Sequence, residues 1–186
     1  MRRFIFLSLC VVLFAPFISL HAQVVPSANG RTLALSAGGL GSIFQPDYAG
    51  LEVAQTSPNR LYGAGAYVDA RFSRWMQLEG EFRWMRFNQY YWEPSAGNGE
   101  NVYLVGPRIP IRNFRKVTPY GKVLIGAGNG SFLTGTSFVV DYGGGLDYQL
   151  SRHLTVRAVD FEYQQWFVTP TLWPYGGSVG ISYKIF

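Results

Sequence analysis

The residues of this chain whose types and spacing could support catalysis are one histidine and one pair of acidic residues. After residue 22 the sequence contains a single histidine, His153, which could act as a general base. Asp160 and Glu162 are two positions apart, and a pair of carboxylates is what the hydrolysis of a glycosidic bond requires. Any enzyme built on this chain would have to use these few groups.

Thiol, metal and phosphate chemistry find little support in the sequence. The one cysteine, Cys10, lies in the first 22 residues, so the rest of the chain has no thiol nucleophile, disulfide or cysteine ligand. The sequence has no set of histidines and cysteines at metal-ligand spacing, and no glycine-rich phosphate loop between a strand and a helix. We therefore expect no cofactor and no metal.

The first 22 residues have the features of a secretory signal peptide. Arg2 and Arg3 precede a nearly unbroken apolar stretch, and a small residue, Ala22, offers a cleavage site. A lipid attached at Cys10 and an uncleaved anchor are the alternatives. The sequence thus predicts a cleaved leader, residues 1–22, and one domain, residues 23–186. Cleavage would leave 14 of the 16 basic residues and all 11 acidic ones.

Eight segments of the remaining chain have the length of a tilted strand that crosses a bilayer. They are bounded by turn residues and rich in glycine, aromatic and β-branched side chains. The segments are residues 32–43, 61–72, 76–87, 101–112, 120–129, 136–150, 154–165 and 175–186. Because only helices and closed barrels can span a membrane, the sequence predicts an all-β, eight-stranded, antiparallel up-and-down transmembrane barrel.

Polar and apolar side chains alternate within these segments. In residues 76–87, for example, Glu79, Glu81 and Arg83 alternate with leucine and aromatic side chains. A period of two indicates strands with one buried face. The charged face and the abundance of aromatics near strand ends favour a lipid-facing exterior over a soluble barrel with an apolar interior. In residues 154–165 the alternation breaks, and a β-bulge near Val159 would turn Asp160 and Glu162 inward.

The connections between the segments alternate in length. Residues 73–75 and 151–153 form tight joins and residues 113–119 a medium one, whereas most of the others are longer. Small barrels of outer membranes have short periplasmic turns and longer extracellular loops. We therefore expect both ends of the mature chain in the periplasm.

Three pieces of sequence resemble a known family. They are Val102 to Arg108, Gly143 to Tyr148, and the ending Val179 to Phe186. With these pieces the chain resembles the small outer-membrane β-barrel proteins of the OmpA and OmpX type over essentially its whole mature length. The resemblance implies the outer membrane of a Gram-negative-type cell, partners among its lipids and the barrel assembly machinery, and a C-terminal assembly signal at Tyr183, Ile185 and Phe186. Phe186 departs from the usual pattern, because Ile185 occupies the face expected for the terminal aromatic.

The predicted interior of the barrel is nearly balanced in charge. An eight-stranded barrel is just wide enough for its own side chains, so enclosed charges must pair. The expected salt-bridge plug consists of Asp69, Arg71, Glu79, Glu81, Arg83, Arg108, Lys122, Asp141, Asp147, Arg157, Asp160 and Glu162. In this interpretation Asp160 and Glu162 each form ion pairs with basic residues of the interior. His153 falls in a periplasmic turn, away from the lipids that a lipid-modifying enzyme would use.

Aromatic residues cluster in and beside the predicted loops, where they could form a membrane-interface girdle or a surface patch for sugars or host proteins. They are Tyr90, Tyr91, Trp92, Trp166, Trp173 and Tyr175. The sequence therefore predicts a non-catalytic outer-membrane barrel with a structural, scaffolding or surface-interaction role. An extracellular ligand of the long loops would fit that role; nucleic acid would not. A narrow small-solute channel is the alternative, and a lipid-modifying enzyme comes third.

Overall fold

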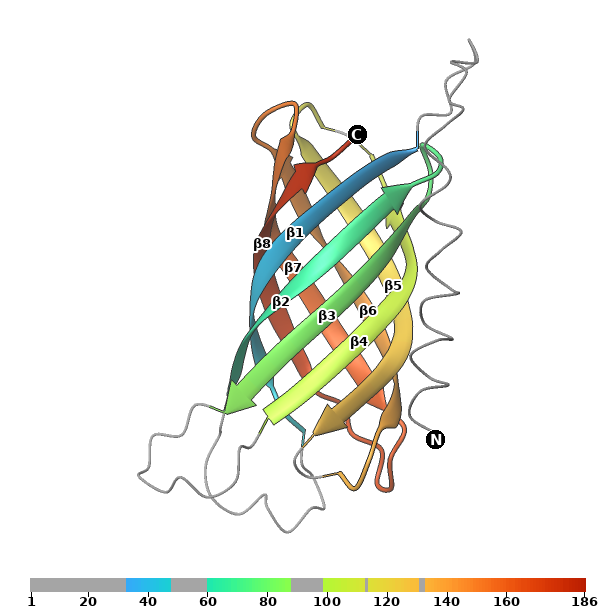
Figure 1. Cartoon of the computed structure of the whole chain (residues 1–186), viewed down its shortest axis with the longest axis vertical. Coiled ribbons are helices and arrows are strands. Elements are labelled where there is room, and N and C mark those ends of the chain that lie inside the picture. Colours follow the sequence, from blue (N-terminus) through green and yellow to red (C-terminus); the bar gives the residue numbers. More distant parts are fainter. Residues whose placement is uncertain (1–32, 48–59, 88–98, 113, 131–132) are drawn as a thin grey trace, which may run out of the picture. The chain divides into compact units, whose positions relative to one another are not determined.

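The strands close into a barrel (Figure 1). The computed structural model describes residues 33–47, 60–87, 99–112, 114–130 and 133–186. Every neighbouring pair of strands is antiparallel, and the first strand pairs with the last. This confirms the predicted fold. The strands are β1 (Ala34–Gln45), β2 (Leu61–Arg71), β3 (Gln77–Phe87), β4 (Gly99–Pro110), β5 (Val117–Gly130), β6 (Ser137–Gln149), β7 (Leu154–Trp166) and β8 (Tyr175–Lys184).

Side-chain burial alternates along the strands as the sequence predicts. In β4, Val102 and Leu104 are buried inside the barrel, whereas Tyr103 and Val105 are about half exposed on its outside. This alternation follows from the pleat of a strand, which sends successive side chains to opposite faces. The inner face therefore collects every second residue of eight strands.

A break in register on β7 adjusts which residues face inward. Arg157 pairs with Gly180 of β8, but the next regular partners are Asp160 and Ser178, and the pairing with β6 shifts between Leu146 and Asp147. Such a bulge adds one residue to a strand and changes the parity beyond it. The bulge lies where the sequence predicts it, and Arg157 and Asp160 are both fully buried.

Short connections join the strands at one end of the barrel, which we call the turn end. They are residues 72–76, 111–116 and 150–153. In the first, the Ser73 hydroxyl accepts hydrogen bonds from the backbone N–H groups of Trp75 and Met76, both at 3.1 Å. Ser151 caps the third turn in the same way for His153 and Leu154. Serine side chains thus replace missing backbone partners in the tight turns.

The other ends of the strands lie at the opposite end of the barrel, which we call the loop end. There the chain leads from β1 to β2, from β3 to β4, from β5 to β6, and from β7 to β8. The predicted leader and the aromatic residues Tyr90, Tyr91 and Trp92 fall outside the described residues. Within the described part, the structure contains no helix with the length and apolar character of a membrane span.

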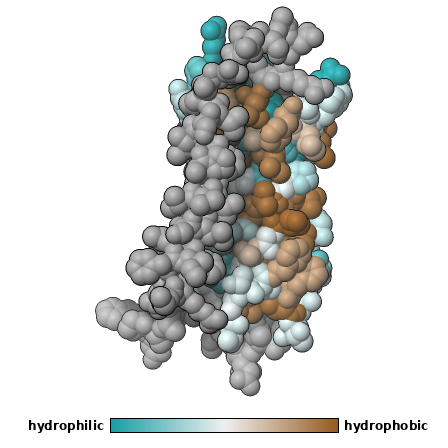
Figure 2. Space-filling view, turned by 45° about the vertical axis from the view of Figure 1, so that its right-hand side comes forward, coloured by the Kyte–Doolittle hydropathy of each residue, from teal (hydrophilic) through white to brown (hydrophobic). Residues whose placement is uncertain are grey.

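The outside of the barrel is covered by apolar and aromatic side chains, which Figure 2 shows along one face. Many of them are between about two fifths and two thirds exposed, and they come from all eight strands. Examples are Ile43, Val68, Phe82, Val105, Val123, Phe138, Phe161 and Ile181. An apolar exterior around an interior that holds charged side chains is the inverse of a soluble barrel and suits a bilayer.

A buried charge network inside the barrel

Charged side chains from six strands, β2 to β7, meet on the inner face of the barrel. Each occupies an inward position, and all are nine-tenths or more buried except Asp147, whose side chain is 17% exposed. We call this set the interior charge network. Its members are Asp69, Glu79, Glu81, Arg83, Arg108, Lys122, Asp141, Asp147, Arg157, Asp160 and Glu162. Eleven of the twelve residues predicted from sequence are therefore brought together, and Arg71 is exposed at the turn end.

Lys122 occupies the centre of the network. Its ammonium nitrogen lies 2.5 Å from Glu162, 2.7 Å from Asp160, and 3.1 Å from both Glu79 and Glu81. Its side chain is fully buried, so these four carboxylates replace the water that would otherwise surround the charge. Lys122 thus connects strands β3, β5 and β7 through one group.

Two arginines extend the network toward the turn end. Arg157 lies 2.5 Å from Glu79 and 3.2 Å from Asp160. Arg108 lies 2.5 Å from Asp147 and 3.4 Å from Asp69. Both guanidinium groups also lie against aromatic rings: Arg157 is 3.9 Å from the centre of Tyr67, and Arg108 is 3.7 Å from that of Tyr120. The rings cover the guanidinium faces while carboxylates bind the edges, a combination that suits arginine.

A third arginine holds the network on the side of the loop end. Arg83 forms ion pairs with Glu81, its near neighbour on β3, and with Glu162 across the barrel. Its guanidinium lies 4.9 Å from the ring centre of Phe44. Arg83 therefore joins the charged layer to apolar side chains beyond it.

A glycine of β6 makes room for this arrangement. A Cβ atom on Gly143 would lie 2.8 Å from Cε of Lys122 and 3.1 Å from Cγ of Glu162. Both contacts are closer than ordinary van der Waals distance, so a larger residue would displace the central ammonium or its partner. Gly143 thus leaves room for the long side chains of Lys122 and Glu162 inside the barrel.

Asp141 is the least connected member of the network. It accepts a hydrogen bond of 3.4 Å from the side-chain amide of Gln164, and it forms no ion pair with any residue of the described ranges. Gln164 in turn accepts a hydrogen bond of 3.1 Å from the indole N–H of Trp166. A chain of polar contacts therefore runs from the charge network to a tryptophan nearer the loop end.

Trp166 corrects one expectation from the sequence. Its type and position near a loop suggest an interfacial aromatic, but the structure buries it completely inside the barrel. The bulge on β7 is the reason, because it turns Asp160, Glu162, Gln164 and Trp166 to the same inner face. Parity beyond the bulge therefore decides the direction of Trp166 more strongly than its residue type.

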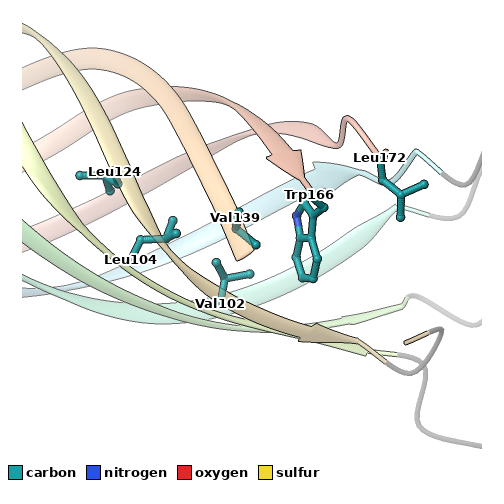
Figure 3. Packing of buried hydrophobic residues seen from close by; sticks show 6 residues of the cluster. All are labelled: Val102, Leu104, Leu124, Val139, Trp166 and Leu172. Atoms are coloured by element: carbon teal, nitrogen blue, oxygen red, sulfur yellow. The ribbon is translucent and has the colours of Figure 1, made fainter. Parts of the chain in front are cut away.

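Trp166 belongs to an apolar layer that the sequence analysis did not identify. The buried members are Val102, Leu104, Leu124, Val139, Trp166 and Leu172, and Figure 3 shows the indole of Trp166 beside Val139 and Val102. Phe44, Leu61 and Met85 form a second buried apolar cluster. The signal was available, since Leu124 shares parity with Lys122 on β5 and Met85 shares parity with Arg83 on β3.

The other predicted aromatic and terminal residues face outward or lie at strand ends. Trp173 is half-buried and stacks on Tyr163 with ring centres 5.5 Å apart, and Tyr175 is exposed. Tyr183, Ile185 and Phe186 are all more than half exposed. Strand pairing continues past β8. The backbone N–H of Leu35 donates a hydrogen bond to the carbonyl of Phe186, and the N–H of Ile185 donates one to the carbonyl of Leu35.

The three carboxylates Glu79, Glu81 and Asp160 lie close enough together to resemble a metal site, with oxygens within 4.8 Å of one another. Lys122 is within hydrogen-bond distance of all three, at 2.7 to 3.1 Å. Its ammonium therefore supplies the positive charge that these oxygens need.

Comparison with known proteins agrees with this architecture. The model of the outer membrane protein beta-barrel domain matches residues 10–184. No curated protein matches the chain. Among solved structures, Neisserial surface protein A is similar over 81% of this chain and 96% of its own, with 11% identity and a TM-score of 0.58. Ail, the attachment invasion locus protein of Yersinia pestis, is similar over 82% and 97%, with 17% identity and a TM-score of 0.51.

The N-terminal β-barrel domain of Pseudomonas aeruginosa OprF is similar over 83% of this chain and 100% of its own, with 10% identity and a TM-score of 0.51. At these identities the likeness concerns the fold. The family match covers almost the whole chain, including every strand of the barrel. The chain therefore belongs to the outer-membrane β-barrel domain family.

Proposed function

We propose that this outer-membrane barrel is non-catalytic, has a structural, scaffolding or surface-interaction role, and is closed inside by the interior charge network acting as a salt-bridge plug. The single observation that carries the proposal is the position of Lys122, fully buried among four carboxylates from two opposed strands. A hydrated pore would leave room for water around such a group. Here protein oxygens surround it.

The apolar layer supports the same proposal. An ion that passed the charge network would next meet Leu124, Val139 and Trp166, each fully buried and packed together. Moving a charge through an apolar constriction without water costs several kcal/mol or more. Charged and apolar layers in series therefore favour a closed lumen over the alternative of a narrow channel.

We infer an orientation from the connections. With the turn end toward the periplasm, as short turns are in barrels of this kind, the longer connections reach the outside of the cell. Residues 48–59 and 88–98, which include Tyr90, Tyr91 and Trp92, would then be available to an extracellular ligand. Outer-membrane lipids around the apolar belt and the assembly machinery, acting on Tyr183 to Phe186, complete the proposed partners. Export by a leader cleaved after Ala22 belongs to the same proposal.

The absence of catalysis is also an inference. His153 lies exposed in a turn at the turn end, where its ring stacks on Tyr183 with centres 5.7 Å apart. Ser151, two residues before it, accepts hydrogen bonds from backbone N–H groups and helps to form the turn. Asp160 and Glu162 are held by Lys122. Each group that could do chemistry therefore has a structural task.

Liposome swelling tests the proposal. Proteoliposomes carrying the purified protein should swell no faster than empty liposomes in isotonic solutions of small sugars or amino acids, because the lumen excludes them. Lipids extracted from the same vesicles should be chemically unchanged. Rapid swelling would support the channel alternative. Lipid products that disappear in the His153→Ala variant would support the enzyme.

A further inference from the structure

A polar vestibule opens at the turn end of the barrel, beyond the interior charge network. Its volume is about 170 Å³, enough for several water molecules or one small polyatomic ion. The lining comes from all eight strands and from the turn before β7, so the cavity lies within the mouth of the barrel. Ser36, Gln77, Gln149 and Thr155 contribute neutral polar groups to it.

The charges that line the vestibule are unequal. Arg71, Arg108, Arg152 and Lys184 contribute four positive charges, and two carboxylates contribute negative ones, which gives a formal net charge of +2. The carboxylates are Asp69 and Asp147. The positive charges therefore exceed the negative ones within a confined polar space.

Both carboxylates already have cationic partners on the floor of the vestibule. Arg108 lies 2.5 Å from Asp147 and 3.4 Å from Asp69, and Arg157 lies 3.6 Å from Asp69. Arg108 also donates a hydrogen bond of 3.0 Å to Gln77. The floor is thus held by its own ion pairs.

The cations at the rim have no such partners. Arg71, Arg152 and Lys184 are exposed, line the cavity, and form no ion pair with any residue of the described ranges. They come from β2, the turn before β7, and the end of β8. Three donors from different parts of the rim therefore converge on one space that contains no free carboxylate from the described lining.

We propose that this vestibule binds a multivalent oxyanion, a phosphate or diphosphate group, through Arg71, Arg152 and Lys184. Arginine guanidinium and lysine ammonium groups donate charge-assisted hydrogen bonds to phosphate oxygens. The neutral hydroxyls and amides of the lining supply further hydrogen bonds. The group could belong to a free ligand or to an anionic lipid headgroup at the inner surface of the membrane. The site is separate from the proposed plug, because its cations lie outside the buried network.

Calorimetric titration of sodium pyrophosphate into the purified protein in zwitterionic detergent tests the site. We expect saturable binding that sodium chloride at equal ionic strength does not reproduce. In the Arg71→Gln, Lys184→Gln double variant, affinity should fall roughly tenfold or more, since each lost charge-assisted contact contributes strongly. The matched control is Arg74→Gln with Arg112→Gln, which removes two charges at the same end from residues that do not line the vestibule.

The outcomes separate the proposal from general attraction to a basic surface. Retained binding in the control, with loss in the lining variant, supports the site. No saturable binding, or equal loss in both variants, overturns it. Repeating the titration in vesicles with and without phosphatidylglycerol distinguishes the two sources. If the vestibule binds lipid headgroups, phosphatidylglycerol should weaken pyrophosphate binding. If it binds a free ligand, pyrophosphate affinity should be the same in both kinds of vesicle. Circular dichroism of each variant checks that the barrel has folded.

Discussion

Replacing Lys122 with alanine should lower the free energy of unfolding of the barrel by about 3–5 kcal/mol, the cost of breaking a buried charge pair from one side. The ammonium is within 3.1 Å of four carboxylates, and its removal leaves them with only the arginines at the edges of the cluster. Urea unfolding in lipid vesicles, followed by tryptophan fluorescence, measures the change.

Lys116→Ala is the matched control, because it removes the same side chain from an exposed position in the turn before β5. It should change stability by less than about 0.5 kcal/mol, as surface substitutions usually do. Equal losses for Lys116→Ala and Lys122→Ala would mean that the network contributes little to stability. An unchanged free energy of unfolding in Lys122→Ala would mean the same.

Replacing Val123 with arginine should cost about 2–4 kcal/mol if the residue lies at the bilayer midplane. Val123 follows Lys122 on β5 but points to the opposite face, where it is 43% exposed among the apolar side chains of the outer belt. The same strand therefore places a charge inside and requires an apolar group outside. Vesicle unfolding is again the measurement.

The control for this variant is an arginine placed on the outside of the barrel but nearer the membrane surface. Ile111 is 68% exposed and lies just past the end of β4, at the turn end, where a bilayer gives way to its interface. Ile111→Arg should cost only about 0–1 kcal/mol, because the charge can reach water. If the two arginines had equal effects, the proposed position of the barrel in the membrane would be wrong.

Much of this fold could be predicted from the sequence because a strand has a fixed two-residue period. The boundaries of all eight strands agree with the structure to within three residues. Glu79, Glu81 and Arg83 are buried as their alternation indicates. The bulge on β7 was also predictable, since the break between Arg157 and Asp160 is visible as a change of parity.

Which side chains meet inside the barrel was less accessible to sequence analysis. Lys122 contacts Glu79 through a sequence separation of 43 residues, and that contact depends on the stagger between strands as well as on parity. The cation–π contacts of Arg157 with Tyr67 and of Arg108 with Tyr120 depend on the same stagger. The two-residue period determines which residues face inward, but it does not determine how far along the barrel axis each residue lies.

The prediction from sequence was wrong at Trp166, and it did not include the vestibule. Tryptophan is common at membrane interfaces, so its position beside a loop suggested that environment. Arg71 was expected in the buried network because it shares parity with Asp69. It lies at the mouth of the barrel instead, because β2 ends at that residue.

The central claim is that the lumen is closed by its own side chains, and single-channel recording in planar bilayers tests it most directly. The unmodified protein should insert without producing steady currents. Arg108→Ala removes the guanidinium that joins Asp69 and Asp147 across the floor of the vestibule, and Trp166→Ala opens the apolar layer, so the double variant should produce measurable conductance. Steady, ion-selective currents from the unmodified protein, unchanged in the double variant, would contradict the claim.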